Sequence, residues 1–352
     1  MNNYWNSMKK IRKAVLYATA AVLLVAGGGL ARPAAASEYN DGISVKYYDS
    51  LKGKKVVLIV ISSGMDIAQG IAAAMTKQSQ DLGFELSVRD YNWNNDQGAQ
   101  AISQAIAEKP DVLVVQNLDM QAYATLFKRA MKEGIKTIQV QVKSTANTDA
   151  YVGVDWYQIA NKNIEKLVSV CSPSAGKSGK IAILQGTPNN PTNFIGMKAI
   201  DDVLALHPEI TVVSKAAADW DATKAHGVVA TVLKQNPDLC GYLGFWDGQD
   251  VGMAAAVTEA GKKGKVFTTT SGAAERSTCA KIEDGSFDNY VAYNIPEVTQ
   301  QLGTAIATAL QQDLPAGQKP YASYVAGRVL TAATYNPDQC WTVDELKKTN
   351  WK

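Results

Sequence analysis

Carboxylate, amide, hydroxyl and indole groups recur in the short segments that follow the apolar runs of this sequence. Ser63 and Asp66 follow one run, Trp93 follows the next, and Trp246 stands beside Asp247 further along. Asp, Asn and Gln side chains can bond vicinal hydroxyl groups, and an indole can pack against the C–H face of a sugar ring. No Arg or Lys lies in these segments, so the set favours a neutral polyhydroxylated ligand over an anionic one.

The sequence supplies little for catalysis or for binding a metal ion. The two histidines, His207 and His226, do not follow an apolar run, so Ser63 lacks a general base. The Gly-Lys-Ser at 176–178 lacks the earlier Gly and the preceding strand of a phosphate-binding loop. We therefore expect no enzyme, no cofactor and no metal site.

Apolar β-branched runs alternate with helix-like segments from Lys54 onward. Expected strands lie at 56–61, 84–91, 112–116 and 135–142, and then at 180–184, 210–215, 241–245, 266–270 and 290–293. Expected helices lie at 67–82, 97–108 and 120–132, and then at 155–170, 194–206, 221–235, 248–260, 274–284 and 296–310. This alternation predicts an α/β fold of two doubly wound parallel-sheet lobes. Such sheets bind ligands outside the carboxyl ends of their strands, where the polar segments fall.

Composition and the N-terminus indicate an exported chain. The 352 residues suggest about two domains, and 35 basic against 33 acidic residues give no charge field that would attract nucleic acid. Residues 1–36 have a basic start, an apolar run at 14–30 and a small-residue site ending at Ala36, which is the layout of a signal peptide. The alternative is a membrane anchor, but the run is short for one and contains three successive glycines.

Four cysteines stand at positions 171, 240, 279 and 340. An even number in an exported chain favours disulfides over a metal site, because zinc sites need close cysteine pairs. Three connectivities are possible.

Several segments resemble, in their order and spacing, the sugar-binding proteins of bacterial ABC transporters, the ribose-binding-like periplasmic group. They are the strand, loop and helix at 55–84, Lys-Pro-Asp-Val-Leu-Val-Val at 109–115, Glu-Gly-Ile-Lys at 133–136, Val-Gly-Val-Asp at 152–155, and Lys-Ile-Ala-Ile-Leu-Gln-Gly-Thr-Pro at 180–188. The resemblance implies a type I periplasmic binding protein with a three-strand hinge near 151–155, 294–296 and 322–325. Its N-terminal lobe would comprise 54–154 plus 293–322, and its C-terminal lobe 155–292 plus 323–352.

The resemblance also implies a function and partners. The chain would be a monomer in the periplasm, would capture a neutral sugar or polyol in the interlobe cleft and would deliver it to an ABC permease in the inner membrane. A ligand sensor that serves a chemoreceptor or a sensor kinase is the alternative. An exported hydrolase is disfavoured because the sequence offers no nucleophile–base pair.

Site residues follow from the positions that match the family's binding segments. Trp220 takes the place of the stacking aromatic, Gln141 that of an Asp and Asn193 that of an Arg. The expected ligand-binding residues are Ser63, Asp66, Trp93, Gln141, Asp155, Asn193, Phe194, Trp220, Trp246, Asp247, Thr270 and Asn294. The departures from the family's usual residues argue against an ordinary hexose or pentose.

Structural roles compete with these assignments. In the alternative interpretation, Trp220 and Trp246 are indoles of the core. Four of the polar residues would then be helix caps, namely Asp66, Asp155, Asp247 and Asn193. A chain tail that returns to the second lobe after about residue 322 would place all four cysteines there. We then expect the pairs Cys171–Cys240 and Cys279–Cys340.

Overall fold

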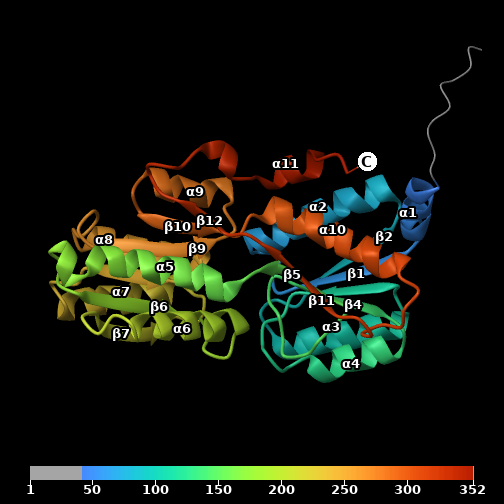
Figure 1. Cartoon of the computed structure of the whole chain (residues 1–352), viewed down its shortest axis with the longest axis horizontal. Coiled ribbons are helices and arrows are strands. Elements are labelled where there is room, and N and C mark those ends of the chain that lie inside the picture. The colour runs from blue at the N-terminus through green and yellow to red at the C-terminus, as the bar shows by residue number, and fades with distance from the viewer. Residues whose placement is uncertain (1–41, 352) are drawn as a thin grey trace, which may run out of the picture. The chain divides into compact units, whose positions relative to one another are not determined.

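The computed structural model describes residues 42–351, and the expected signal peptide at 1–36 lies outside them. Two six-stranded sheets organise this part of the chain, with strand orders β11-β5-β4-β3-β1-β2 and β12-β10-β9-β8-β6-β7 (Figure 1). Every strand pair is parallel except β10 with β12. We call each sheet with its helices a lobe. The predicted type I periplasmic binding protein fold is confirmed.

The first lobe contains β1 (Lys55–Val60), β2 (Glu85–Asp90), β3 (Val112–Val115), β4 (Lys136–Val140), β5 (Ala150–Val154) and β11 (Tyr321–Val325), with helices α1 (Ile43–Leu51), α2 (Asp66–Leu82), α3 (Asn95–Glu108), α4 (Ala124–Lys132) and α10 (Ile295–Gln311). Helices α1, α2 and α10 pack together, and so do α3 and α4.

The second lobe contains β6 (Lys180–Gln185), β7 (Thr211–Ala217), β8 (Gly241–Gly244), β9 (Phe267–Gly272), β10 (Asn289–Ala292) and β12 (Arg328–Leu330), with helices α5 (Trp156–Cys171), α6 (Pro191–Leu204), α7 (Ala222–Gln235), α8 (Asp247–Glu259) and α9 (Arg276–Glu283). Helix α5 packs with α6, and α7 packs with α8. The remaining elements are a short helix α11 (Val343–Lys348) and two 3₁₀ turns, Pro173–Ala175 and Pro337–Gln339.

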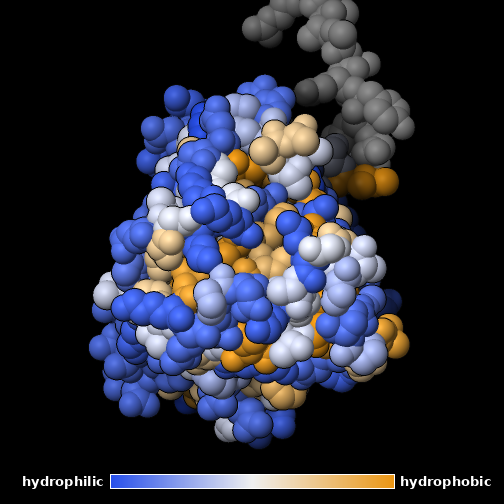
Figure 2. Space-filling view, turned by 90° about the vertical axis from the view of Figure 1, so that its left-hand side faces the viewer, coloured by the Kyte–Doolittle hydropathy of each residue, from blue (hydrophilic) through white to orange (hydrophobic). Residues whose placement is uncertain are grey.

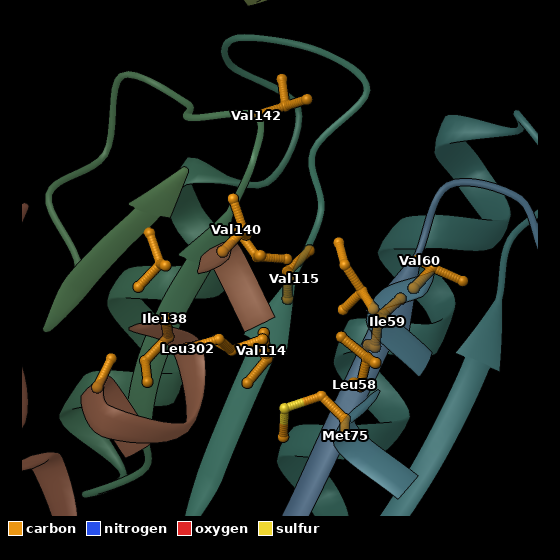
Figure 3. Packing of buried hydrophobic residues seen from close by; sticks show 14 of the residues in the cluster. Leu58, Ile59, Val60, Met75, Val114, Val115, Ile138, Val140, Val142 and Leu302 are labelled. Carbon is orange, nitrogen blue, oxygen red and sulfur yellow. The ribbon is translucent and has the colours of Figure 1, made fainter. Parts of the chain in front are cut away.

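The core of the first lobe forms because its central strands are apolar on both faces. Leu58 of β1, Val114 of β3 and Ile138 of β4 are fully buried, and Met75 of α2 and Leu302 of α10 lie close to them (Figure 3). Burial of each such side chain contributes about 1.5–3 kcal/mol. The rigid sheets that result hold the loops at their carboxyl ends in place.

Three passages of the chain between the two lobes directly follow strands of the sheets: after β5, after β10 and after β11. The third crossing lies at 326–327, slightly beyond the expected 322–325, because β11 pairs with β5 as far as Val325. These crossings form the hinge.

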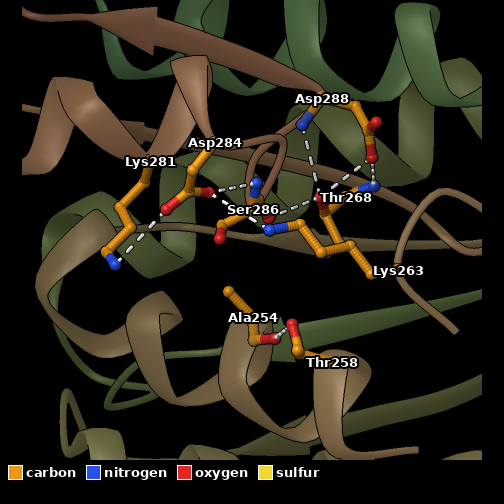
Figure 4. Close-up of polar contacts among 8 residues, drawn as sticks. All are labelled: Ala254, Thr258, Lys263, Thr268, Lys281, Asp284, Ser286 and Asp288. Atoms are coloured by element: carbon orange, nitrogen blue, oxygen red, sulfur yellow. Dashed lines mark hydrogen bonds and ion pairs between the residues drawn. The ribbon is translucent and has the colours of Figure 1, made fainter. Parts of the chain in front are cut away.

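Charged groups gather at the opposite end of the second sheet from the hinge. Lys263 and Lys281 both pair with Asp284, at 3.4 and 3.5 Å, near the start of β9 and β10 (Figure 4).

The face of the molecule in Figure 2 is mostly hydrophilic, with hydrophobic residues in scattered groups. Between residues 42 and 351, no helix combines the length and apolar character that spanning a bilayer requires.

The four cysteines form two disulfides, Cys171–Cys240 and Cys279–Cys340, with S–S distances of 2.07 and 2.04 Å. This is the pairing expected from the sequence. The first joins the end of α5 to the residue before β8, and the second joins α9 to the C-terminal tail.

The tail from residue 331 to 351, here called the C-terminal strap, contacts both lobes. Its Cys340 is linked to α9, and the Trp341 indole Nε1 donates to Ala273 O at 2.7 Å. The Trp341 ring also lies over Gly70 of α2, where an added Cβ would come within 2.5 Å of it. The strap therefore departs from the expected placement of 323–352 in the second lobe alone.

The end of the strap lies along α2 (Figure 1). Leu346 of α11 is buried in the core of the first lobe, and Trp351 N donates to Asp81 at 3.1 Å. Burial of Leu346 explains why the tail joins the first lobe. The apolar pattern of so short a helix is too weak a signal for this contact to be predicted from the sequence.

Replacing Cys279 and Cys340 together by Ser should lower the free energy of unfolding by roughly 2–4 kcal/mol, measured by urea denaturation, because the cross-link spans 61 residues and restricts the unfolded chain. The Cys171→Ser/Cys240→Ser variant should lose a similar amount, since its cross-link spans 69 residues. Unchanged stability in either variant would contradict a stabilising cross-link.

Candidate functional site

A cavity of about 50 Å³ lies between the lobes, at the carboxyl ends of both sheets. Its lining contains nine aliphatic or aromatic and four amide or hydroxyl side chains, and none that is acidic or basic. The lining residues are Ile61, Met65, Ile67, Trp93, Gln116, Gln141, Val142, Trp156, Asn190, Thr192, Trp220, Trp246 and Tyr293.

Four indoles line this cavity, and one of them, Trp246, contacts two of the others. The Trp246 ring of the second lobe lies 6.2 Å from that of Trp93 in the first lobe and 6.3 Å from that of Trp220. Trp156, which follows β5, makes an edge contact with Tyr293 at 4.8 Å. The contact between Trp93 and Trp246 joins the two lobes directly.

Left-handed backbone holds two of the indoles in place. Trp93 (φ 60°) follows Asn92 (φ 44°) after β2, and Trp220 (φ 64°) follows Asp219 (φ 54°) after β7. Residues other than glycine rarely adopt this conformation, and each costs roughly 1–3 kcal/mol, so such residues cluster at functional sites. Both lobes use the same device after the edge strand of their sheet.

Local hydrogen bonds hold this strained backbone. Trp93 N donates to Ile61 O at 3.0 Å, and Trp220 N donates to the Gln249 side chain at 2.8 Å. The Trp220 ring also lies over Gly186, where an added Cβ would come within 2.2 Å of it. Glycine at this position is therefore what lets the indole reach the cavity.

Several buried polar atoms of the lining have no partner among the described residues. They are Nε2 and Oε1 of Gln141, Nε1 of Trp220 and Nε1 of Trp246. Gln141 is only 1% exposed, and its backbone is fixed because its carbonyl accepts from Tyr151 Oη and Trp156 Nε1. Buried polar groups are normally paired, so unpaired ones beside a cavity point to a ligand.

A hydrogen bond also joins the lobes beside the cavity. Asn190 Nδ2 of the second lobe donates to Leu118 O of the first at 2.9 Å, while its Oδ1 accepts from Thr192 N and caps α6. The structure therefore shows the lobes in contact across the cleft.

Four of the twelve site residues expected from the sequence line this cavity: Trp93, Gln141, Trp220 and Trp246. The other eight lie outside its lining. Three of these have partners within their own lobe: Ser63 bonds Asp90, Asp155 caps α5, and Asn193 accepts from Gly186 N at 3.0 Å.

The other five expected residues outside the lining also lie at defined places in the fold. Phe194 is 60% exposed, Thr270 Oγ1 donates to buried Asp250, and Asn294 Nδ2 donates to Glu297 at the start of α10. The last two, Asp66 and Asp247, begin α2 and α8. A ligand role for all twelve residues, including the four in the lining, stays a prediction.

Residues not selected from the sequence complete the lining, notably Gln116, Trp156, Asn190, Thr192 and Tyr293. Gln116, Asn190 and Tyr293 stand in the polar segments that follow strands, so position alone would have found them. Trp156 follows the first crossing directly, and Thr192 lies in the first turn of α6.

Burial raises the pKa values of three carboxyl groups near the cleft. Burial, with the charge of Glu275, raises the pKa of Asp66 to about 6. Burial and then the charge of Asp66 raise the pKa of Asp247 well above its usual range, although Tyr290 Oη donates to this carboxylate at 2.5 Å. Burial raises the pKa of Asp250 to about 7. Because burial disfavours the charged form, these carboxyl groups accept a proton at higher pH than exposed ones do.

The described residues thus form two doubly wound lobes that three crossings join, with a cavity between the carboxyl ends of their strands. The chain belongs to the periplasmic binding protein domain family, whose model matches residues 56–314.

Curated relatives carry names of sugar-binding proteins. The D-apiose import binding protein of Actinobacillus succinogenes is 20% identical over 209 residues, covering 59% of this chain and 66% of the relative. The D-allose-binding periplasmic protein of Escherichia coli is 27% identical over 179 residues, covering 48% of this chain and 56% of the relative. The chain thus spans 56–66% of the length of these two relatives.

Solved structures share the fold. An ABC transporter periplasmic solute binding protein from Actinobacillus succinogenes with bound D-allose aligns with a TM-score of 0.70 and 22% identity, covering 80% of this chain and 98% of that one.

The Asp66→Asn variant should lose one source of pH-dependent stability. Because the folded-state pKa of about 6 exceeds the usual 3.8, the protonated carboxyl stabilises the fold below about pH 4, and this contribution is lost as the pH rises through about 6. Urea unfolding should show the variant gaining roughly 1–3 kcal/mol over the unmodified chain at about pH 7.5 and little at about pH 4.

Asp96→Asn is the matched control, since Asp96 is exposed in the first turn of α3. It should show no such gain. An equal gain for Asp66→Asn at both pH values would contradict burial as the cause.

Proposed function

We propose that this chain is the solute-binding component of an ABC importer and captures a neutral sugar or polyol between its lobes. The observation that carries the proposal is the cavity itself, in which indoles from both lobes surround unpaired amide and indole N–H groups without any acidic or basic side chain. An anionic sugar would be buried there without a cationic partner, which is costly.

The names of the relatives support a sugar as the ligand, since two of them are named for D-apiose and D-allose. They also favour import over the sensing role considered from the sequence. The chain would be exported by the signal peptide at 1–36 and would act as a monomer in the periplasm, with a permease of the inner membrane as its partner.

Binding would work through a shift between open and closed lobes. In the open form the three crossings bend and the Asn190–Leu118 and Trp93–Trp246 contacts are broken. A ligand that bonds groups from both lobes favours the closed form by its difference in affinity for the two. Closure then presents both lobes to the permease in one arrangement, and the ligand leaves chemically unchanged.

Thermal-shift measurements on a panel of neutral sugars, polyols and sugar acids test this function. A neutral member should raise the melting temperature, because it binds the native state alone. Stabilisation by sugar acids only would contradict the neutral-ligand proposal, and conversion of a bound sugar into a product would contradict the binding role.

Trp220→Ala should weaken binding of the stabilising sugar about 30-fold, or about 2 kcal/mol, when measured by titration calorimetry, because it removes a buried aromatic face. Leu206→Ala is the control, since Leu206 is 78% exposed and lies outside the lining. An effect of Leu206→Ala with none of Trp220→Ala would move the site away from this cavity.

A further inference from the structure

We propose that Gln249 and Asp250, two adjacent residues near the start of α8, are positioning residues that fix the spacing of the Trp220 and Trp246 indoles in the cavity. Neither side chain belongs to the lining, and both are fully buried. This inference rests on the proposed function and names the residues that set the geometry of its site. It follows from a path of hydrogen bonds and from the direction in which each bond runs.

The two side chains link the backbones of both indole-bearing residues. Trp220 N donates to Gln249 Oε1 at 2.8 Å, and Gln249 Nε2 donates to Asp250 Oδ1 at 3.2 Å. Trp246 N in turn donates to Asp250 Oδ2 at 3.2 Å. A continuous path of three hydrogen bonds therefore runs from the turn after β7 to the segment after β8.

Two glycines give this path the room that it needs. An added Cβ at Gly244 of β8 would come within 1.9 Å of Asp250 Oδ2. One at Gly252 of α8 would come within 1.9 Å of Ala222 O, in the first residue of α7. Gly244 therefore lets the carboxylate lie against the strand, and Gly252 lets α8 lie close to the turn that carries Trp220.

The carboxylate fixes the direction of each bond in the path. An ionised carboxylate accepts hydrogen bonds and donates none, and Thr270 Oγ1 also donates to Asp250. Asp250 thus turns the Nε2 group of Gln249 toward itself, which leaves Gln249 Oε1 as the acceptor for Trp220 N. The carboxylate thereby acts on Trp220 through Gln249.

The consequence of this path lies in the cavity, where the two rings meet edge to face with centroids 6.3 Å apart. The indole N–H groups of Trp220 and Trp246 are buried and have no partner among residues 42–351. The oxygen atoms of a sugar that accept from both must match the spacing of these two donors. Bonds at both backbone N–H groups hold that spacing before a ligand arrives, so less binding free energy is lost in ordering the rings.

An exchange of amide and carboxylate tests the direction of the bonds. In Asp250→Asn, whichever way the two neighbouring amides turn, one donor faces another at Trp220 N, at Trp246 N or between the two side chains. The double variant Gln249→Glu/Asp250→Asn restores every pairing. Its new amide donates to the new carboxylate, which accepts from Trp220 N, and the oxygen of that amide accepts from Trp246 N.

Near-UV circular dichroism of the ligand-free chain reports how firmly the indoles are held, and Trp220→Phe defines the part of the signal that comes from Trp220. The spectra are recorded at about pH 8.5, where Asp250 is ionised, because burial raises its pKa to about 7. Asp250→Asn should lose the Trp220 part of the signal, and the double variant should keep it.

Titration calorimetry measures the effect on binding, with whichever of D-allose, D-ribose, xylitol and myo-inositol raises the melting temperature most. Asp250→Asn should bind this compound about tenfold or more weakly, and the double variant should bind it within about threefold of the unmodified chain. Thr269→Val is the matched control, since it removes a buried hydrogen bond to Asn163 elsewhere in the second lobe. It should lower the melting temperature without changing the affinity or the spectrum.

An unchanged spectrum or an unchanged affinity in folded Asp250→Asn would overturn this inference and leave the proposed function standing. So would an equal loss in Thr269→Val, or a double variant that fails to fold or lacks the Trp220 signal. If Asp250→Asn does not fold, the double variant decides alone, and the signal of the unmodified chain then supports the path. Absence of binding by every neutral sugar and polyol would overturn the proposed function, while the ligand-free spectra would still decide the positioning role.

Discussion

The site depends on two strained turns that carry indoles over the ends of the sheets. Each turn places two successive residues in the left-handed region, after β2 in one lobe and after β7 in the other. A flexible loop would relax such a backbone, but here each turn is fixed between an edge strand and the helix that follows it, α3 or α7. The bonds from Trp93 N to Ile61 O and from Trp220 N to Gln249 add to this, so local structure determines where Trp93 and Trp220 lie.

Closure brings together groups that differ in their preference for water. Indoles, aliphatic side chains and an unpaired amide line the cavity, while the acidic groups Asp66 and Asp247 stand just outside it. The raised pKa values of these two groups show that burial of their charge is unfavourable. The closed form without ligand therefore combines apolar contact, which favours it, with unpaired polar groups, which oppose it.

Much of this fold was predictable because buried parallel strands are apolar throughout. The run 56–61 indicates such a strand, and strands alternating with helices imply strand ends that converge on one edge. That reasoning located Trp93, Trp220 and Trp246. It could not distinguish a helix cap from a ligand contact at Asp155, because both roles call for the same side chains. It also did not predict that Asn190 caps α6, while Asn193 lies inside that helix and accepts from Gly186 N.

Other features had no local signal. The unpaired state of Gln141 depends on which neighbours fill its surroundings in three dimensions. The contact of the strap with α2 depends on Gly70, a single residue in the middle of a helix, leaving room for Trp341. Neither follows from residue periodicity, which reports which face of an element is buried but not what covers it.

The C-terminal strap adds a fourth link between the lobes, next to the crossings. Arg328, just after the third crossing, donates to Gln339 O of the strap at 2.8 Å, and the Trp341 ring lies at Gly70 beside Ile295, the first residue of α10 after the second crossing. Cys340 is fixed to α9 and Trp341 is seated on α2, so the strap fastens the two lobes to each other where the backbone passes between them. A displacement of one lobe against the other would therefore have to deform the strap as well as the crossings.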